Sequence, residues 1–283
     1  MGRRRWVVVS ALVGVVVGCG TGTPATSPPS TPSAVETPHP AAPRATAPDP
    51  PDLPDLPGAV ARAVEAAGGI DLGLTVVDLD TGAGHDADVP FRSASLSKLL
   101  VAVDLLLSGE VPQEDVRRLE RALGLSDDEA MNALWTLHDG MGAIRRVVER
   151  VGLTAAGAPA DATQWGDVEM SAADVARLYR FVLTELPEDD RDFVVDALSG
   201  AGEIAADGFD QAYGLMAPGT NAYAKQGWMW YPPADLYLHT AGVAGGRYVV
   251  VALSRQSGVA EREAKDRLTG VTGALLSALS RAG

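Results

Sequence analysis

Cysteine and lysine are scarce in this 283-residue sequence, which contains one cysteine, Cys19, and only three lysines against 20 arginines. A single cysteine excludes an intramolecular disulfide. The formal net charge is −14, so the chain lacks the basic excess that nucleic acids attract, and we expect no nucleic-acid partner. No spacing of cysteine and histidine residues predicts a metal site, and we expect no cofactor.

The first 18 residues have the order of a secretory signal. Three arginines precede an apolar run from residue 6 to residue 17, which is too short to span a bilayer comfortably. The run ends in the letters VVGC, which resemble the lipobox of bacterial lipoproteins. That resemblance implies a signal peptide of residues 1–18, a lipid anchor on Cys19 at the cell membrane, and an extracytoplasmic location. The alternative is an incidental cysteine in an uncleaved anchor.

A change in composition divides the remaining chain. Residues 19–57 are rich in Pro, Thr, Ser and Ala and have almost no apolar side chain to bury, so we predict an extended tether. Residues 58–283 have the content of a globular domain of common size, which we expect to be a monomer.

Hydrophobic periodicity predicts the order helix, strands, helical block, strands, helix. Helices are predicted over residues 59–67, 95–107, 115–123, 127–138, 141–151, 171–186 and 259–279. Strands are predicted over residues 72–79, 222–229, 236–243 and 247–254, with a hairpin turn at 80–82 and a loop over 153–168. We therefore predict an α+β fold, in which both ends of the chain form an antiparallel sheet with flanking helices.

The stretch FRSASLSKLL, residues 91–100, raises the question of catalysis because Ser95 lies three residues before Lys98. Positions i and i+3 of a helix share a face, so the hydroxyl and the amine would be neighbours. A serine hydroxyl needs an adjacent base, and lysine can lose its proton whereas arginine cannot. The spacing alone is more typical of a solvated helix start, but one of only three lysines stands here.

Two more motifs follow in the order of active-site serine penicillin-binding proteins and class A β-lactamases. The stretch around Ser95 resembles the F-x-x-A-S-x-x-K motif of that family, "SDDEAMNAL" from Ser126 resembles its S-D-N motif, and "YAKQGWM" around Lys225 resembles its K-T-G strand. The letters "TQWG" and "LHTAGV" are similar to actinobacterial lipoproteins related to class A β-lactamases. The resemblance implies a β-lactamase/transpeptidase-like fold over residues 58–283, with a trimmed helical subdomain.

The resemblance also implies roles for the matching residues. Ser95 would be the nucleophile and Lys98 its base or proton relay. Ser126 would pass a proton toward the leaving group, and Lys225 would orient Ser126 and a substrate carboxylate. From the residues alone, Ser126 could instead be a helix N-cap and Lys225 an exposed strand lysine.

Four further positions would contact the substrate. The backbone N–H of Trp228, with that of Ser95, would form the oxyanion hole, and Gly227 would leave room for the substrate backbone. Asp128 stands where the family has Asn, and Gln226 where Thr or Ser is usual; we expect both side chains to face the substrate. An ionised Asp cannot donate to an amide carbonyl as Asn does.

The predicted loop lacks the E-x-x-L-N motif, whose glutamate positions the hydrolytic water in class A enzymes. Its region contains the acids Asp161, Asp167 and Glu169, none in a matching motif. His239 could line the cleft or be structural. Three functions follow: an acylating serine hydrolase acting on peptide-like or peptidoglycan-related substrates, a catalytically weak or inactive envelope binding protein, and a true β-lactamase, which the missing glutamate disfavours.

Overall fold

The structure is a computed structural model that describes residues 55–78 and 81–281. The predicted signal peptide, Cys19 and most of the predicted tether lie outside the described residues. The chain divides into two units, and the fold below is that of the second, Pro50–Gly283. No described helix combines the length and the apolar character needed to cross a membrane.

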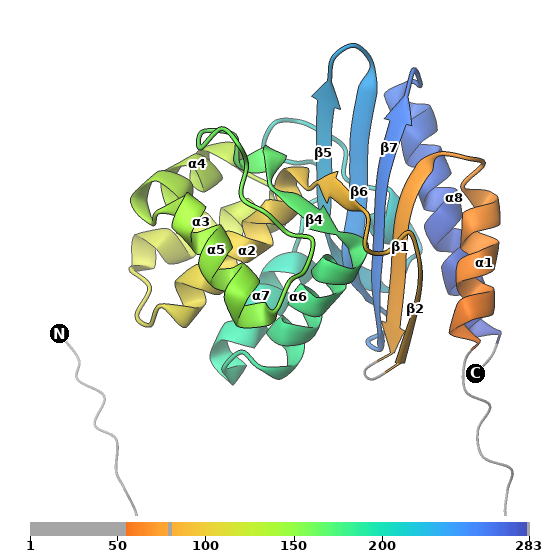
Figure 1. Cartoon of the computed structure of the whole chain (residues 1–283). Coiled ribbons are helices and arrows are strands. Elements are labelled where there is room, and N and C mark those ends of the chain that lie inside the picture. The colour runs from red at the N-terminus through yellow and green to blue at the C-terminus, as the bar shows by residue number, and fades with distance from the viewer. Residues whose placement is uncertain (1–54, 79–80, 282–283) are drawn as a thin grey trace, which may run out of the picture. The chain divides into compact units, whose positions relative to one another are not determined.

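A five-stranded antiparallel sheet lies at the centre of the fold (Figure 1). Its strand order is β2 (Thr81–His85), β1 (Asp71–Asp78), β7 (Tyr248–Ser257), β6 (Asp235–Ala244) and β5 (Ala222–Tyr231). Both ends of the chain contribute strands, as the sequence predicts. Asp78 pairs with Thr81, so Thr81 and Gly82 belong to β2 and not to the predicted turn.

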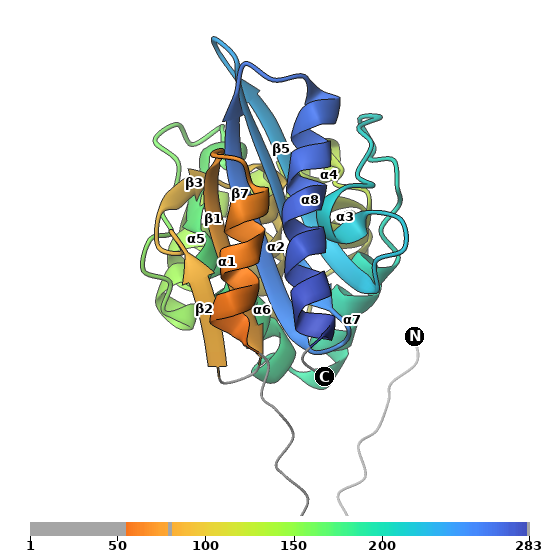
Figure 2. The ribbon, with the colours of Figure 1, turned by 90° about the vertical axis from the view of Figure 1, so that its right-hand side faces the viewer.

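Helices cover both faces of this sheet. On one face, α1 (Leu56–Ala66) packs beside α8 (Glu261–Ser280) (Figure 2). The other face carries α2 (Ser97–Leu107), α3 (Gln113–Gly124), α4 (Asp128–Leu137), α5 (Gly140–Val151), α6 (Ala172–Thr184) and α7 (Glu188–Ser199). Cover on both sides explains why β7, with its run of valines, is buried at almost every position instead of at alternate ones.

One helix and several short elements are absent from the prediction. They are β3 (Pro90–Arg92), its antiparallel partner β4 (Glu169–Ser171), helix α7, and the 3₁₀ turns η1 (Ala94–Leu96), η2 (Trp165–Asp167) and η3 (Gly214–Met216). Three-residue segments are too short to show a period. Helix α7 buries only Val194 and Leu198, although Pro187 and the acidic residues after it are a helix-start signal.

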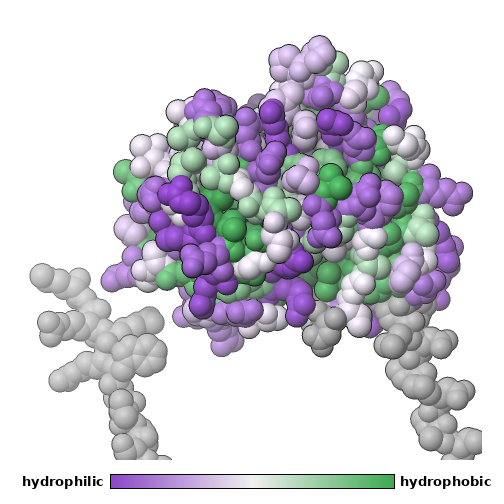
Figure 3. All heavy atoms as spheres, in the orientation of Figure 1, coloured by the Kyte–Doolittle hydropathy of each residue, from purple (hydrophilic) through white to green (hydrophobic). Residues whose placement is uncertain are grey.

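The outer surface is mixed in character. On the face seen in Figure 1, hydrophilic and hydrophobic residues are interspersed (Figure 3). Large apolar side chains with high exposure include Leu137, Ile204 and Trp230, which come from three separate segments. Single exposed apolar residues of this kind are ordinary on a globular domain.

Candidate active site

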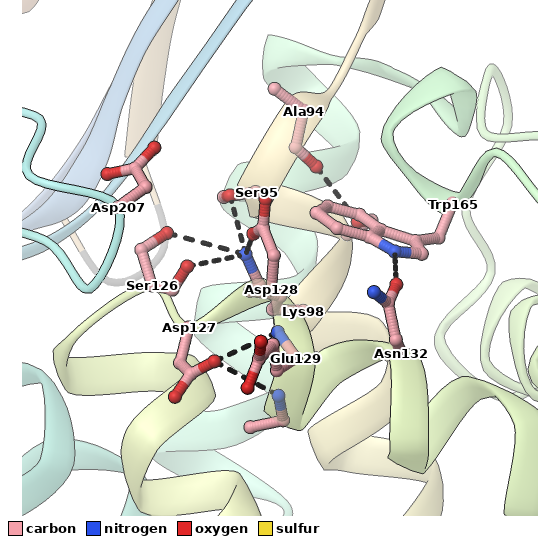
Figure 4. Close-up of polar contacts among 12 residues, drawn as sticks. Ala94, Ser95, Lys98, Ser126, Asp127, Asp128, Glu129, Asn132, Trp165 and Asp207 are labelled. Carbon is pink, nitrogen blue, oxygen red and sulfur yellow. Dashed lines mark hydrogen bonds and ion pairs between the residues drawn. The ribbon is translucent and has the colours of Figure 1, made fainter.

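The first predicted pair of catalytic residues meets where β3 leads into α2 (Figure 4). Ser95 lies in η1 and Lys98 in the first turn of α2, and Lys98 Nζ is 2.8 Å from Ser95 Oγ. Ser95 is 4% exposed and Lys98 1% exposed, so the interpretation as a solvated helix start is wrong. The preceding residue, Ala94, has a φ of +47°, a left-handed conformation that costs energy for a residue with a Cβ.

Two more predicted residues reach the same point from distant parts of the chain. Ser126 directly precedes α4, and Lys225 lies on β5, the edge strand. Lys225 Nζ donates to Ser126 Oγ at 2.7 Å, while Lys98 Nζ donates to the Ser126 carbonyl at 2.9 Å. The structure thus brings all four predicted catalytic side chains together, and they are buried.

This geometry decides two alternatives left open by the sequence. Ser126 is not the N-cap of α4, because the Asp127 carboxylate accepts from the N–H groups of Glu129 and Ala130. Lys225 is fully buried, so it is not an exposed strand lysine. Asp127 frees the Ser126 hydroxyl for its contact with the lysine.

Burial governs the protonation of both lysines. Burial lowers the pKa of Lys98, and the carboxylate of Asp128, with Oδ1 2.6 Å from Nζ, opposes this shift only in part. Burial, and then the nearby charge of Lys98, hold the pKa of Lys225 well below its usual range. Both amines are therefore closer to neutrality than an exposed lysine.

The contacts of Lys98 fit a neutral amine as well as a charged one. An ammonium would donate to Ser95 Oγ, the Ser126 carbonyl and Asp128. A neutral amine keeps two N–H donors for Ser126 and Asp128, and its lone pair then faces the Ser95 hydroxyl proton. The same arrangement can therefore act as a general base toward Ser95.

Gln226 contradicts the prediction that its side chain faces the substrate. Successive side chains of a strand point to opposite faces, and Lys225 takes the face toward Ser126. The Gln226 amide instead donates to the backbone carbonyls of Gln211, at 3.0 Å, and Tyr213, at 2.6 Å. It ties the segment before β5 to the sheet, a role that the motif match could not indicate.

The absence of a side chain at Gly227 is explained by the packing of the protein itself. A Cβ at this position would lie 3.0 Å from the Ser93 carbonyl oxygen and 3.3 Å from the His239 ring. The missing side chain therefore allows β5 to pass closely over η1. His239 is itself buried, with Nε2 2.8 Å from the Arg92 carbonyl and Nδ1 accepting from the Ser254 N–H. Burial lowers the pKa of His239 to about 4, so it is a neutral structural residue.

Trp228 follows Gly227 on the edge strand. Its indole stacks on Phe209, with centroids 4.3 Å apart, and its N–H donates to Asp207 at 3.3 Å. The charge of Asp207, which is labelled in Figure 4, acts to raise the pKa of both Lys98 and Lys225, and no motif in the sequence singles this residue out. The backbone N–H groups proposed for the oxyanion hole, those of Ser95 and Trp228, stay a prediction.

The predicted loop contributes an aromatic ring to the site. The ring centroid of Trp165 lies 4.4 Å from Lys98 Nζ, and its indole N–H donates to Asn132 Oδ1 at 2.8 Å (Figure 4). In the sequence, Trp165 stands out only as part of a resemblance, and this contact was not predicted. A tryptophan in a segment otherwise rich in Gly, Ala and Asp was the available signal.

The acids of this region are engaged away from Ser95. Asp161 accepts from the N–H and hydroxyl of Thr163. Asp167 accepts from the Tyr231 hydroxyl and pairs with Arg92 at 4.0 Å. Glu169 lies exposed on β4, opposite Arg92. In the described part of the chain, the acid in direct contact with Lys98 is Asp128, and no three or more His, Cys, Asp or Glu side chains are grouped to hold a metal.

Comparisons with known proteins show relatives of this chain and structures of similar fold. No protein family model matches the chain. Curated relatives named "Putative lipoprotein LppW", from Mycobacterium bovis and Mycobacterium tuberculosis, are 31% identical over 208 residues. The match covers 68% of this chain and 65% of the relatives, so the chain spans just under two thirds of their length.

Solved structures of similar fold include class A β-lactamases. A β-lactamase from Chitinophaga pinensis has a TM-score of 0.66 at 14% identity, and covers 78% of this chain and 99% of its own. A class A representative from Bacteroides cellulosilyticus has a TM-score of 0.64 at 12% identity, with 79% and 99% covered. The chain therefore has the α+β fold of class A β-lactamases and is a distant homologue of the mycobacterial "Putative lipoprotein LppW".

Proposed function

We propose that this protein is a serine hydrolase of the cell envelope that forms an acyl-enzyme on Ser95. The observation that carries the proposal is the buried series of Ser95, Lys98, Ser126 and Lys225, linked by contacts of 2.7 to 2.9 Å. Burying two amines costs free energy, and the fold could fill the same volume with apolar side chains. Lysines whose pKa is lowered beside a serine are typical of a catalytic site.

The geometry supports an acylation step in which every transferred proton has a donor and an acceptor. Ser95 Oγ attacks the substrate carbonyl carbon while its proton moves to Lys98 Nζ. The backbone N–H groups of Ser95 and Trp228 stabilise the resulting oxyanion. The bond to the leaving nitrogen then breaks, and the Ser126 hydroxyl, oriented by Lys225, donates the proton which that nitrogen takes up. The Lys98 ammonium replaces this proton on Ser126 Oγ, 3.5 Å away.

The proposed substrates are peptide-like or related to peptidoglycan, because the family resemblance and the envelope location agree on that class. The name of the relatives, "Putative lipoprotein", supports a lipid anchor at Cys19 and an extracytoplasmic location. The strongly acidic chain, with its net charge of −14, suits a small-molecule or peptide substrate better than a nucleic acid. We propose that the protein acts as a monomer.

One contact favours a second candidate function, that of a non-catalytic binding protein. Asp128 Oδ1 lies 2.6 Å from Lys98 Nζ, and a carboxylate at that distance stabilises the ammonium form. An ammonium cannot accept the Ser95 proton. Efficient turnover of β-lactams is the least favoured function, because the loop offers no carboxylate beside the nucleophile.

Covalent labelling tests the proposal. The purified full-length protein is incubated with a fluorescent penicillin, and stable label is measured on a denaturing gel. We expect labelling of the wild type, none of Ser95→Ala, and normal labelling of Ser97→Ala, a neighbouring serine whose hydroxyl bonds to the Ala94 carbonyl. Absence of label at every concentration, or equal label on Ser95→Ala, would contradict the assignment of Ser95. A chromogenic cephalosporin should show negligible sustained turnover.

A further inference from the structure

We propose that Trp165 is a positioning residue that protects the acylated site from hydrolysis by covering the amine of Lys98. The inference rests on the proposed function, since it concerns the fate of the acyl group on Ser95. The loop over residues 153–168 lacks a carboxylate placed to activate water. Under this proposal, it also helps to retain the acyl group, because Trp165 keeps water away from Lys98.

The distance between the ring and the amine leaves no space for water. Lys98 Nζ lies 4.4 Å from the centroid of the Trp165 ring. A water between them would need contacts of roughly 3 Å on each side, or about 6 Å in total. The other partners of the amine are Ser95, Ser126 and Asp128. Water approaching from the side of the loop is therefore kept away from Lys98.

The indole is fixed and not loosely placed. Its N–H donates to Asn132 Oδ1 at 2.8 Å, which ties the loop to α4. The next residue, Gly166, lies against the side chain of Met229, whose Cε is 2.1 Å from the place that a Cβ would take. Trp165 is only 9% exposed, so most of its surface is packed against the protein.

A second tryptophan holds the same loop without covering the amine. The indole N–H of Trp135 donates to the Ala162 carbonyl at 2.8 Å. Each of the two tryptophans thus makes one indole hydrogen bond that joins the loop to α4. The ring that contacts Lys98 is that of Trp165. The two residues form a matched pair for separating the stability of the loop from the covering of Lys98.

Hydrolysis of the acyl-enzyme needs water next to a base. Water must attack the acyl carbonyl while a base takes its proton, and the bond from the carbonyl carbon to Ser95 Oγ must then break with return of a proton to Ser95. Lys98 is the base within reach of Ser95 Oγ, at 2.8 Å. With Trp165 in place, no water can occupy the loop side of this base, so the acyl group persists. Removing the ring should admit water and allow Lys98 to activate it.

The test follows the loss of label after acylation. The full-length protein is labelled with fluorescent penicillin, excess reagent is removed, and the remaining label is measured over time. Trp165→Ala should release the label on the order of 10²-fold faster than wild type. Trp165→Phe keeps a ring over Lys98 and loses only the bond to Asn132, so its release should stay close to that of wild type. Trp135→Ala should also release slowly.

The outcomes separate this inference from the proposed function. Equal release from Trp165→Ala and wild type, with both labelled, overturns the shielding role and leaves the acyl-enzyme proposal standing. Equally fast release from Trp135→Ala also overturns it, because loosening of the loop would then suffice. If circular dichroism shows that Trp165→Ala is unfolded, Trp165→Leu decides, because leucine fills part of the volume without placing a ring over Lys98: faster release supports the role, and release equal to that of wild type overturns it. A wild type that takes no label overturns both proposals.

Discussion

Two regions meet at Lys98, and they differ in what they offer to catalysis. On one side, η1, α2, the segment before α4 and strand β5 supply the buried serines and lysines of the proposed acylation site, which contact one another directly. On the other side, the loop over residues 153–168 supplies an indole, and its acids bind elsewhere. If Ser95 is acylated as we propose, formation of the acyl-enzyme and its hydrolysis depend on separate segments of the chain.

The difference also shows in how each region is held. The acylating residues are fixed by hydrogen bonds between distant segments, as in the contact of Lys225 with Ser126, 99 residues apart in sequence. The loop is held in part by two tryptophans, Trp135 and Trp165. A buried polar network is sensitive to the loss of any one member. Packed aromatic rings mainly determine which space is open to water.

The largest effect that sharpens this comparison should come from Lys98→Met. Methionine keeps the length and apolar stem of the side chain but removes the base, so labelling by penicillin should slow by about 10³-fold. The rate constant of labelling is measured by stopping the reaction at a series of times and quantifying the label on denaturing gels. Lys265→Met is the matched control, because that amine lies 3.9 Å from the Phe209 ring and contacts Glu261 instead of Ser95. Equal loss of labelling in both variants would mean that Lys98 acts only through stability.

The sequence was sufficient to predict the sheet, most helices and the group of residues that meet at the candidate site. The i,i+3 spacing of Ser95 and Lys98 is a local property, and the contact follows from it directly. Ser126 and Lys225 were found through motif order, and the fold confirms that they meet. These features depend on short segments with strong patterns, or on a resemblance that extends over the whole domain.

The sequence could not show in which direction the side chains next to the motif lysines and serines point. Gln226 was expected at the substrate because of its place in a motif, but strand alternation turns it toward the carbonyl of Tyr213. The contact of Trp165 with Lys98 joins residues 67 positions apart and has no periodic signature. Such contacts depend on how the loop packs against α2 and α4, which only the folded chain determines.

A smaller effect should come from Asp128→Asn. This change tests whether the Asp128 carboxylate slows acylation by keeping Lys98 protonated. The Asp128 charge stabilises the ammonium of Lys98, so its removal should lower the pKa of Lys98 further. Acylation needs the neutral amine and therefore sets in as pH rises through this pKa. The pH profile of labelling should move down by about one unit, with faster labelling at neutral pH.

The control for Asp128→Asn is Glu129→Gln, which removes the same charge from the next residue of α4. The profile of this control should stay in place, since Glu129 is exposed and Asp128 is the carboxylate in direct contact with the amine. A shift of the Asp128→Asn profile to higher pH, or an equal shift in both variants, would show that the contact between Asp128 and Lys98 does not set the protonation of the base. In that case, Asp128 would not limit acylation, and the loop over residues 153–168 would be the part of the site that limits catalysis.

The smallest effect on labelling should come from Gln226→Thr, although this change restores the residue type usual in the related motif. Because the amide points away from Ser126 toward the carbonyls of Gln211 and Tyr213, its loss should leave acylation nearly unchanged. Two buried carbonyls would lose their donor, which should lower the free energy of unfolding by about 1–3 kcal/mol. The labelling rate and the thermal denaturation of the variant check these two expectations. The control is Gln256→Thr, which removes a buried amide on β7 that donates to the Ala264 carbonyl. Labelling that rises strongly in Gln226→Thr alone would mean that position 226 faces the ligand during acylation. In that case, the substrate side of β5 would limit this protein as much as the loop does.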